Sequence, residues 1–261
     1  MGHNAPRMLL EGKRGVVLNV VNGRSLGWAI AEAAAGQGAK VGVGAQNERT
    51  ADTVARLIEG NASYVPLQID FSYDEQFEAL REDIRAKLGT IDFVVHSAAY
   101  APKEDLQGAF LDVSREGFRI AMDVSCYSLI KLCQTLLPIL NEDGSVVTLT
   151  YLGSVRAVPG YGVMGVAKAA LESAVRYLTV DLGAKGVRIN ALSPGPINTV
   201  AARGVRNLSS MIDLVHERAP LKRPFAQPEV ASSALYLLSD LSRGVTGQVL
   251  YIDNGYNILG L

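Results

Sequence analysis

The feature of this chain that most limits its fold is an unbroken alternation of short apolar runs with helix-like segments. The runs are rich in β-branched residues and lack polar alternation, as is typical of strands covered on both faces; they lie at 15–20, 40–45, 63–69, 91–97, 144–150, 187–193 and 248–253. Helical periodicity separates them, at 26–37, 48–59, 74–88, 114–141, 161–184 and 228–239. This repetition predicts an α/β fold with a doubly wound, seven-stranded parallel sheet and right-handed crossovers.

The same pattern predicts a single domain over residues 1–261. No linker or low-complexity segment interrupts it, and 261 residues of which 48% are hydrophobic are enough for one sizeable core. The rhythm breaks at about 196–226, where a short helical stretch, SSMIDLVHERA, is bounded by Pro196, Pro220 and Pro224. Because this stretch follows the carboxyl end of a predicted strand, we expect it to form a small helical lid over a ligand site.

Composition argues against several classes of protein. The formal net charge is −1 and there is no lysine- or arginine-rich tract, so we expect no nucleic-acid partner. No apolar run approaches the ~20 residues of a membrane span, and the N-terminus lacks the apolar region of a signal peptide. Cys126 and Cys133 are seven residues apart in a helical pattern, which is about 10 Å along the axis and too far for a disulfide. Packed thiols indicate a reducing compartment, so we expect a cytoplasmic protein.

The turn after the first predicted strand is a candidate nucleotide site. It reads NVVNGRSLGWAIA over 19–31, with Gly23 and Gly27 in the turn and Ser25 placed to cap the next helix or to bind phosphate. A strand, turn and helix in this order offer backbone N–H groups and a helix N-terminus to a pyrophosphate. The usual G-x-G-x-x-G spacing is missing, so on this turn alone an ordinary strand–helix loop is an equal alternative.

Residues after the second and third predicted strands bear on the choice of nucleotide. Sheets that bind NAD often place an acid after the second strand for the adenosine ribose, and sheets that bind NADP place a base there. This chain has the neutral Gln46, which can bond a diol, with Arg49 nearby, and we expect NADH rather than NADPH. Asp70 and Phe71 end the third strand, where an adenine edge would lie, although Asp70 suits a helix cap equally well.

Two tyrosines and a lysine mark the candidate chemical end of the site. Tyr161 and Lys168 are seven residues apart in a helical pattern, so both lie on one face, and Tyr151 precedes Tyr161 by ten residues. An ammonium group beside a phenol lowers the phenol pKa from ~10, which makes tyrosine a usable proton donor or oxyanion partner. A helix without a catalytic role can show the same Tyr–Lys spacing, but the position of this pair after the fifth strand of a parallel sheet favours a catalytic role. No His, Cys and carboxylate cluster has metal-ligand spacing, so we expect no metal.

At these residues the chain resembles the short-chain dehydrogenase/reductase superfamily, which has a Rossmann-type fold, and more closely its divergent branch, the enoyl-[acyl-carrier-protein] reductases. The resemblance extends from GKRGVVLNV to VTGQVLYIDNGYNI and rests on FVVHSAAYAP (93–102), SREGFRIAMDVSCYS (114–128), TLTYLGSVRAVPGYGVMGVAKAALE (148–172) and GVRINALSPGPINTVAARGV (186–205). The Tyr-x9-Tyr-x6-Lys array is quite specific to this branch. Ordinary members of the superfamily have a serine thirteen residues before the tyrosine, where this chain has Thr148; by resemblance, Tyr151 takes the place of that serine.

The resemblance implies a reaction and roles for three residues. In the family, a dihydronicotinamide gives hydride to C3 of a trans-2-enoyl thioester, the enolate on the thioester oxygen is stabilised, and C2 is protonated. Mapped on this chain, Tyr161 would bond the thioester oxygen, Tyr151 would support the site and proton delivery, and Lys168 would hold the nicotinamide ribose. Two other readings stay open: a carbonyl or alcohol oxidoreductase, which needs no Tyr151, and a non-catalytic nucleotide-binding protein.

The resemblance also implies contacts for the two ligands. Those with the cofactor are Asn19, Ser25, Leu26, Gln46, Asp70, Phe71, Ala98, Lys168, Ile197, Thr199, Val200 and Ala201. Those with the acyl chain are Tyr100, Ala101, Met164 and Met211, for which core packing is the alternative. The family usually has glycine where this chain has Asn19. Asparagine tolerates positive φ better than most residues, but its side chain has room to crowd the dinucleotide.

Partners follow from the same resemblance. We expect acyl-carrier protein bearing the enoyl substrate, and a homotetramer assembled through the helices at 114–141 and 161–184 and the last strand. Arg203 and Arg206 in the lid are candidates for contact with the acidic carrier protein, and solvated arginines are the alternative. His96, at the end of the fourth strand, is expected to be a hydrogen-bonded structural residue.

Overall fold

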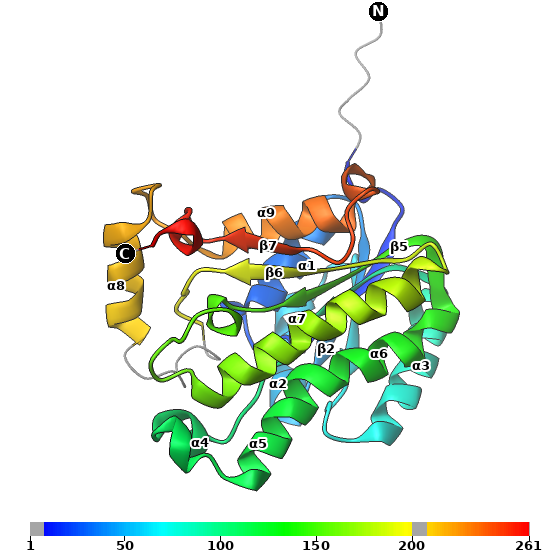
Figure 1. Cartoon of the computed structure of the whole chain (residues 1–261). Helices are drawn as coiled ribbons and strands as arrows, with labels where there is room; N and C mark the ends of the chain where they lie inside the picture. Colours follow the sequence, from blue (N-terminus) through cyan, green and yellow to red (C-terminus); the bar gives the residue numbers. More distant parts are fainter. Residues whose placement is uncertain (1–7, 200–207, 261) are drawn as a thin grey trace, which may run out of the picture.

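A seven-stranded sheet forms the centre of the protein. The computed structural model describes residues 8–199 and 208–260, and within them the strand order is β3-β2-β1-β4-β5-β6-β7 with every neighbouring pair parallel. The strands are β1 (Arg14–Leu18), β2 (Lys40–Ala45), β3 (Tyr64–Gln68), β4 (Ile91–His96), β5 (Leu140–Leu149), β6 (Arg188–Pro194) and β7 (Val249–Ile252). Each lies at a predicted apolar run, and the predicted α/β fold class is confirmed (Figure 1).

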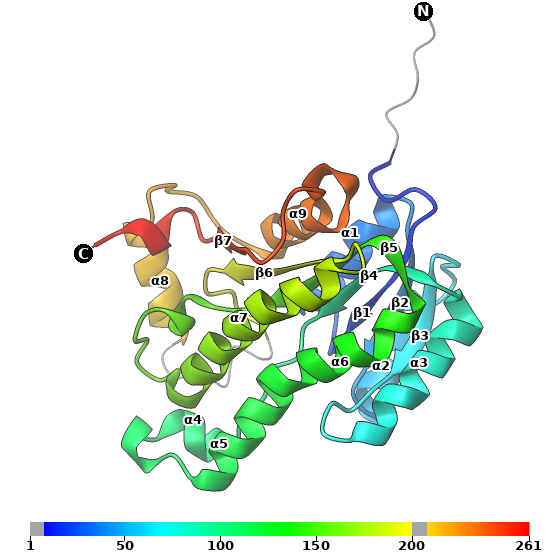
Figure 2. The same ribbon diagram turned by 45° about the vertical axis from the view of Figure 1, so that its right-hand side comes forward.

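Helices cover both faces of the sheet, as Figures 1 and 2 show. One face carries α1 (Leu26–Gly36), α2 (Glu48–Ile58) and α9 (Gln227–Leu238). The other carries α3 (Asp74–Leu88), α5 (Arg115–Met122), α6 (Ser128–Leu136) and α7 (Gly162–Gly183). Successive strand residues alternate between the two layers, so that Val16 packs with the second group and Val17 with the first. This two-sided burial explains the apolar runs without polar alternation in the five central strands, whereas the edge strands β3 and β7 are only partly buried.

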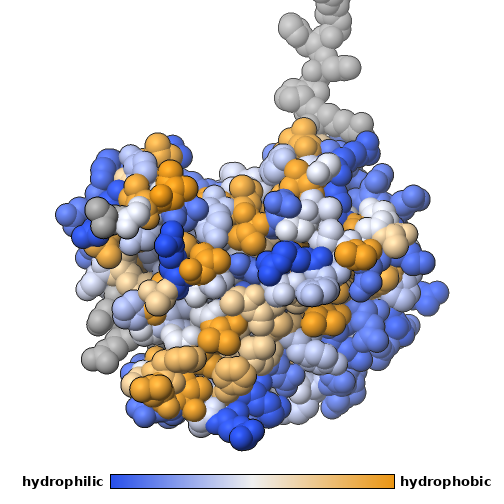
Figure 3. All heavy atoms as spheres, in the orientation of Figure 1, coloured by the Kyte–Doolittle hydropathy of each residue, from blue (hydrophilic) through white to orange (hydrophobic). Residues whose placement is uncertain are grey.

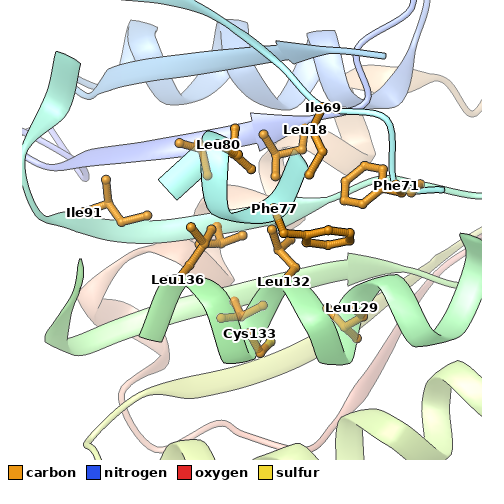
Figure 4. Close-up of a cluster of buried hydrophobic side chains, with 14 of the residues drawn as sticks. Leu18, Ile69, Phe71, Phe77, Leu80, Ile91, Leu129, Leu132, Cys133 and Leu136 are labelled. Carbon is orange, nitrogen blue, oxygen red and sulfur yellow. The ribbon is translucent and has the colours of Figure 1, made fainter. Parts of the chain in front are cut away.

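The larger core cluster shows how the helices are attached to the sheet. In Figure 4, Leu18 of β1 and Ile69, which directly follows β3, face Phe77 of α3 and Leu132 of α6. These side chains are almost completely buried. Cys133 lies in the same cluster, and both Cys126 and Cys133 are buried free thiols, as predicted.

The strand order determines where a ligand can bind. The chain runs outward from β1 through β2 to β3, then returns to β4 on the other side of β1 and continues to β7. The crossover direction therefore reverses between β1 and β4. In open α/β sheets a crevice forms at such a point, outside the carboxyl ends of the strands.

The segment expected to be one helix over 114–141 is interrupted. α5 ends at Met122, a π-helical turn spans Asp123–Tyr127, and α6 ends at Leu136 before the 3-10 turn Leu137–Ile139. The prediction was therefore too long at its carboxyl end, because Pro138 lacks the N–H that a helix interior requires. The π-turn leaves local carbonyls without their usual partners, and the Ser128 hydroxyl donates to Val124 O at 2.7 Å.

The segment that contains α5, the π-turn and α6 is also strongly apolar. By length and composition alone Arg115–Ile139 would suit a membrane span, which the sequence reading did not anticipate. However, 56% of its most apolar window is buried inside the protein. Leu129 and Leu132 pack against the sheet and α3. Burial of this kind is what a core helix shows.

Two helices flank the carboxyl ends of the strands. α4 (Lys103–Gln107) was not predicted, because five residues are too few for a periodic pattern. α8 (Leu208–Arg218) matches the short helix predicted within 196–226, and Figure 2 shows it beyond the ends of β6 and β7. Both helices therefore lie at the edge of the sheet where a ligand crevice is expected.

Candidate active site

A cavity of about 490 Å³ opens at the carboxyl ends of the central strands. This volume is typical of small-molecule and cofactor sites. Its walls come from α1, the segments after β4, β5 and β6, and helices α4, α7 and α8; the lining residues are Leu26, Ser97, Ala98, Ala99, Tyr100, Ala101, Lys103, Leu106, Leu149, Thr150, Tyr151, Tyr161, Met164, Lys168, Pro194, Gly195, Pro196, Ile197, Thr199, Leu208 and Met211. All three predicted catalytic residues are brought together here.

Tyr151 and Tyr161 are in direct contact. Tyr151 follows β5, Tyr161 immediately precedes α7, and their ring centroids are 4.8 Å apart in an edge-to-face arrangement. A Cβ atom added to Gly153 would lie 2.5 Å from Cδ1 of Tyr161, so only glycine fits beneath this ring. The two phenols are therefore held by packing rather than by a flexible loop alone.

Burial, rather than Lys168, controls the acidity of the two phenols. The pKa of Tyr161 is raised above its ordinary value, first by burial and then by Tyr151 and Glu172. Burial also raises the pKa of Tyr151, to about 12. The expected lowering of the phenol pKa by Lys168 is thus wrong for the protein without a nucleotide. Both phenols are protonated near neutral pH and act as hydrogen-bond donors.

Lys168 lies on the floor of the cavity and is only 4% exposed. Tyr161 is the N-cap residue of α7 and Lys168 follows seven residues later, and both side chains line the cavity. Its Nζ donates to the carbonyl of Leu149, the last residue of β5, at 2.8 Å. Burial lowers the pKa of Lys168 to about 8, against the opposing effects of Cys126 and Glu172.

Thr148, at the serine position of ordinary superfamily members, does not reach the cavity. Its Oγ1 is 2.9 Å from Nδ1 of His96, and Nε2 of His96 is 2.8 Å from the hydroxyl of Ser128. All three side chains are fully buried, and burial lowers the pKa of His96 to about 3. His96 is therefore a neutral, hydrogen-bonded structural residue, as predicted, and it joins β4, β5 and α6.

The π-turn places a second serine against the loop after β4. The Ser125 hydroxyl accepts from Tyr100 N at 3.0 Å and lies 3.1 Å from Tyr100 O, where it can donate. Its Oγ is also 3.7 Å from the sulfur of Met164. Because residues 97–101 all line the cavity, Ser125 helps to define the shape of its wall. Periodicity could not reveal this role, because a π-turn shifts the helix face by one residue.

The candidate phosphate turn has the geometry of an anion site. Ser25 caps α1, its hydroxyl accepting from Trp28 N at 3.3 Å and donating to Asn22 O at 2.7 Å. Asn19 adopts a left-handed φ of 66°, the conformation for which glycine is usual. Its amide donates to Ser97 O at 3.1 Å, while the Ser97 hydroxyl donates to Leu18 O at 2.6 Å. These reciprocal bonds join the ends of β1 and β4 at the switch point.

The remaining predicted cofactor residues are less close to the cavity. Gln46 follows β2, and its backbone N–H donates to the Thr50 hydroxyl at 3.1 Å. The Asp70 carboxylate accepts from Ser72 N at 3.0 Å, and so caps a local turn rather than α3. Phe71 turns its ring into the core, in edge-on contact with Phe77 and His96. The Phe71 side chain therefore belongs to the core, and only its backbone is available to a nucleotide.

The predicted residues thus fall into three groups. Those that line the cavity are Leu26, Ala98, Tyr100, Ala101, Tyr151, Tyr161, Met164, Lys168, Ile197, Thr199 and Met211. Those placed around it but outside its lining are Asn19, Ser25, Gln46, Asp70 and Phe71. Val200 and Ala201 lie outside the described residues. Sequence reasoning missed the other lining residues, most of which lie in loops, at strand ends or in a short helix without periodicity: Ser97, Ala99, Lys103, Leu106, Leu149, Thr150, Pro194, Gly195, Pro196 and Leu208.

These features suit a dinucleotide. The capped N-terminus of α1 and the β1–β4 crevice form an anion site of the kind that binds pyrophosphate. Lys168, with its Nζ at the same edge of the sheet, is a donor suited to ribose hydroxyls. In the described part of the chain, no three His, Cys, Asp or Glu side chains converge as metal ligands would.

A parallel sheet with this order, a cavity at the switch point, and a tyrosine–lysine pair on the helix after β5 define a reductase of the short-chain dehydrogenase type. Comparison with known proteins is more specific. The family model described as enoyl-(acyl carrier protein) reductase matches residues 20–257. The chain belongs to this family, as the sequence motifs predicted.

Individual relatives are similar to this chain over nearly its whole length. The chain is 45% identical to the NADH-dependent enoyl-[acyl-carrier-protein] reductase FabI of Bacillus cereus over 255 residues, which are 97% of this chain and 99% of the relative. A structure of the Bacillus cereus enzyme with NADP⁺ and indole naphthyridinone has a TM-score of 0.93 at 44% identity, covering 97% and 99% of the two chains. The Anaplasma phagocytophilum enzyme with NAD has a TM-score of 0.93 at 39% identity, covering 97% of each chain.

Proposed function

We propose that this protein reduces the C2=C3 double bond of trans-2-enoyl thioesters on acyl-carrier protein with NADH, the last step of the fatty-acid elongation cycle. The observation that carries the proposal is the convergence of Tyr151, Tyr161 and Lys168 on one cavity at the switch point of the sheet. Family membership and the NADH-dependent relatives support it. When bound, the cofactor would supply the hydride that is transferred to C3.

Tyr161 is assigned to the thioester oxygen. Its raised pKa keeps the phenol protonated, so its hydroxyl is a donor for the negative charge that develops on that oxygen. A donor fixed in a dry cavity stabilises such a charge by ~3 kcal/mol. Packing against Tyr151 and Gly153 holds the ring in place before substrate binds.

Lys168 and Tyr151 are assigned supporting roles. The ammonium of Lys168 would hold the nicotinamide ribose and add positive charge near the developing oxyanion. Tyr151 keeps the Tyr161 ring in place through its edge-to-face contact and is a candidate in the delivery of a proton to C2. Its pKa of about 12 means that the phenol carries that proton throughout the physiological range.

For the cofactor, we propose the contacts that the resemblance implies, with Asn19 and Ser25 at the pyrophosphate turn and Gln46 beyond β2. The neutral Gln46 supports NADH over NADPH, as do the names of the relatives. The acyl chain would lie between Tyr100, Ala101, Met164 and Met211, which share the apolar wall of the cavity.

We further propose that residues 1–261 form one domain with a lid at about 196–226. Met211 of α8 lines the cavity, which supports a lid above the substrate. Arg203 and Arg206, candidates for contact with acyl-carrier protein, lie outside the described residues. Buried free thiols at Cys126 and Cys133 support the proposal of a reducing, cytoplasmic location.

A homotetramer is proposed from the outer face of the long helices. On α7, Tyr177 is 77% exposed and Val180 is 73% exposed, and Phe118 and Ile130 are exposed on α5 and α6. Figure 3 shows hydrophobic side chains gathered in a band over this part of the surface. Exposed apolar patches of this kind mark interaction surfaces. Sedimentation should give a tetramer, and a monomer would contradict the proposal.

The decisive assay uses purified protein with a crotonyl thioester and either NADH or NADPH. We expect oxidation of NADH with loss of the enoyl absorbance, and slower oxidation of NADPH. Reduction of ketones without loss of that absorbance would favour a carbonyl oxidoreductase instead. NADH binding with no turnover of any enoyl thioester would favour a non-catalytic nucleotide-binding protein.

A further inference from the structure

A buried carboxylate beside the cavity has no part in the roles assigned above. Glu172 lies on α7 four residues after Lys168 and is only 5% exposed. Its Oε1 accepts a hydrogen bond of 2.6 Å from the hydroxyl of Thr150. A glutamate is almost never fully buried unless it is paired, so this position requires a compensating group.

Lys168, one helical turn earlier on α7, is a group of opposite charge. Residues four apart on a helix are neighbours on one face, with about 5–6 Å between their Cβ atoms, and Lys168 is as deeply buried as Glu172. The two side chains also bind consecutive residues at the end of β5. Lys168 Nζ donates to Leu149 O at 2.8 Å, and Thr150 donates to Glu172. Tyr151 is the next residue, so α7 holds the strand end that carries this phenol at two points.

We propose that Glu172 is a positioning residue of the reductase site: held by Thr150, its carboxylate is the fixed counter-charge that keeps Lys168 protonated and steadies the strand end that carries Tyr151. Its effect on turnover rests on the proposed function. Its effect on the charge of Lys168 does not, because that charge is a property of the protein alone.

Apart from Glu172, the titratable groups shown to interact electrostatically with Lys168 in the described part of the chain are Cys126 and His96, and both are neutral. His96 of β4 has a pKa of about 3 because of its burial. Burial raises the pKa of the Cys126 thiol in the π-turn, and the pKa of Tyr161 at the start of α7 is also raised by burial. Glu172 is therefore the charged group among those that act on Lys168 in the described part of the chain.

The test titrates Lys168 in the full-length protein without ligands. Lysine labelled with ¹³C at Cε reports its own protonation by NMR, and Lys168→Arg identifies the resonance. Glu172→Gln keeps an oxygen acceptor for Thr150 but removes the charge. Since an opposite charge one helical turn away raises a lysine pKa, the variant should titrate at a lower pH than the wild type, by up to about one pH unit. Asp181→Asn removes an exposed carboxylate about 20 Å from Lys168 along the same helix and should leave the titration unchanged.

Substitutions of Thr150 provide a second test of the proposal. Thr150→Val releases the carboxylate from its fixed position, so Lys168 should titrate lower than in the wild type, by less than in Glu172→Gln. Thr150→Ser restores the hydroxyl and should restore the wild-type titration. A Glu172→Gln protein that titrates at or above the wild-type pH overturns the proposal. If that variant does not fold, an unchanged Lys168 titration in Thr150→Val overturns it.

Turnover separates this proposal from the proposed function. With NADH and a crotonyl thioester, the alkaline decline of kcat should move to lower pH in Glu172→Gln, together with the Lys168 titration. An active wild type whose decline is not moved by Glu172→Gln contradicts the role of Glu172. A wild type without enoyl reduction refutes the proposed function, and the NMR titration then decides the charge relation by itself.

Discussion

Removal of the hydroxyl oxygen of Tyr161 tests the proposal that this residue donates a hydrogen bond to the thioester oxygen. Tyr161→Phe deletes the hydroxyl and leaves the ring, which is enclosed by the Tyr151 ring at 4.8 Å and by Gly153. Volume-conserving changes of this kind usually cost less than about 1.5 kcal/mol of stability, so the variant should fold. Because burial keeps the Tyr161 phenol protonated, the change removes one hydrogen-bond donor and no charge.

The expected loss lies in the chemical step. One donor aimed at a developing oxyanion in a buried site is worth about 3–4 kcal/mol, which corresponds to a decrease in kcat of ~10²–10³-fold. The affinity for NADH should stay within about twofold, because the hydroxyl acts on the transition state and not on the bound cofactor.

The assay follows NADH oxidation with a crotonyl thioester, and a separate fluorescence titration measures the dissociation constant of NADH. Tyr73→Phe is the matched control, since Tyr73 lies at the start of α3, outside the cavity lining, and is 51% exposed; its kcat should equal that of the wild type. If Tyr161→Phe folds normally and its kcat lies within about threefold of the wild type, Tyr161 has no part in the mechanism.

Three further predictions concern the surroundings of the tyrosines. Lys168→Ala should weaken NADH binding by ~10-fold or more, because it removes a charged donor; an unaltered dissociation constant in a fluorescence titration would count against the ribose role. Ser125→Ala leaves both backbone groups of Tyr100 without their partner, so urea unfolding should show a loss of ~1–3 kcal/mol, accompanied by a higher KM for the thioester. His96 has a folded pKa of about 3, whereas an unfolded histidine titrates near 6.5. Between these two pH values the unfolded state therefore binds more protons than the folded state. The free energy of unfolding should fall as pH drops below 6.5, by up to ~1.4 kcal/mol per pH unit. His96→Gln should flatten that slope between pH 5 and 7, and an equally steep slope would show that another group causes it.

Local sequence patterns predicted much of the fold. The central strands could be located because two-sided burial requires continuous apolar runs, and the helices between the strands followed from their periodicity. Errors occurred where local rules compete. Pro138 and the π-turn at Asp123–Tyr127 divided a segment that looks like one long helix, and the five residues of α4 were too short to show a period.

The candidate site also has a part that local sequence patterns predicted and a part that they could not predict. The seven-residue spacing of Tyr161 and Lys168 was enough to place both on one face of a helix, because helical geometry is local. The direction of the Phe71 ring, the contact of Ser125 with Tyr100, and the bond from Thr150 to Glu172 join residues distant in the chain. No local pattern encodes such contacts.

The sequence by itself therefore determined the order of the elements, the family and the chemical groups available. Only the tertiary structure decided the state of those groups. The pKa of Tyr161 rises, although a neighbouring lysine was expected to lower it, because burial removes solvent from the phenol and the effects of Tyr151 and Glu172 act in the same direction. Desolvation depends on every segment that closes over a side chain, so it is settled by packing across the whole molecule and not by the spacing of two residues.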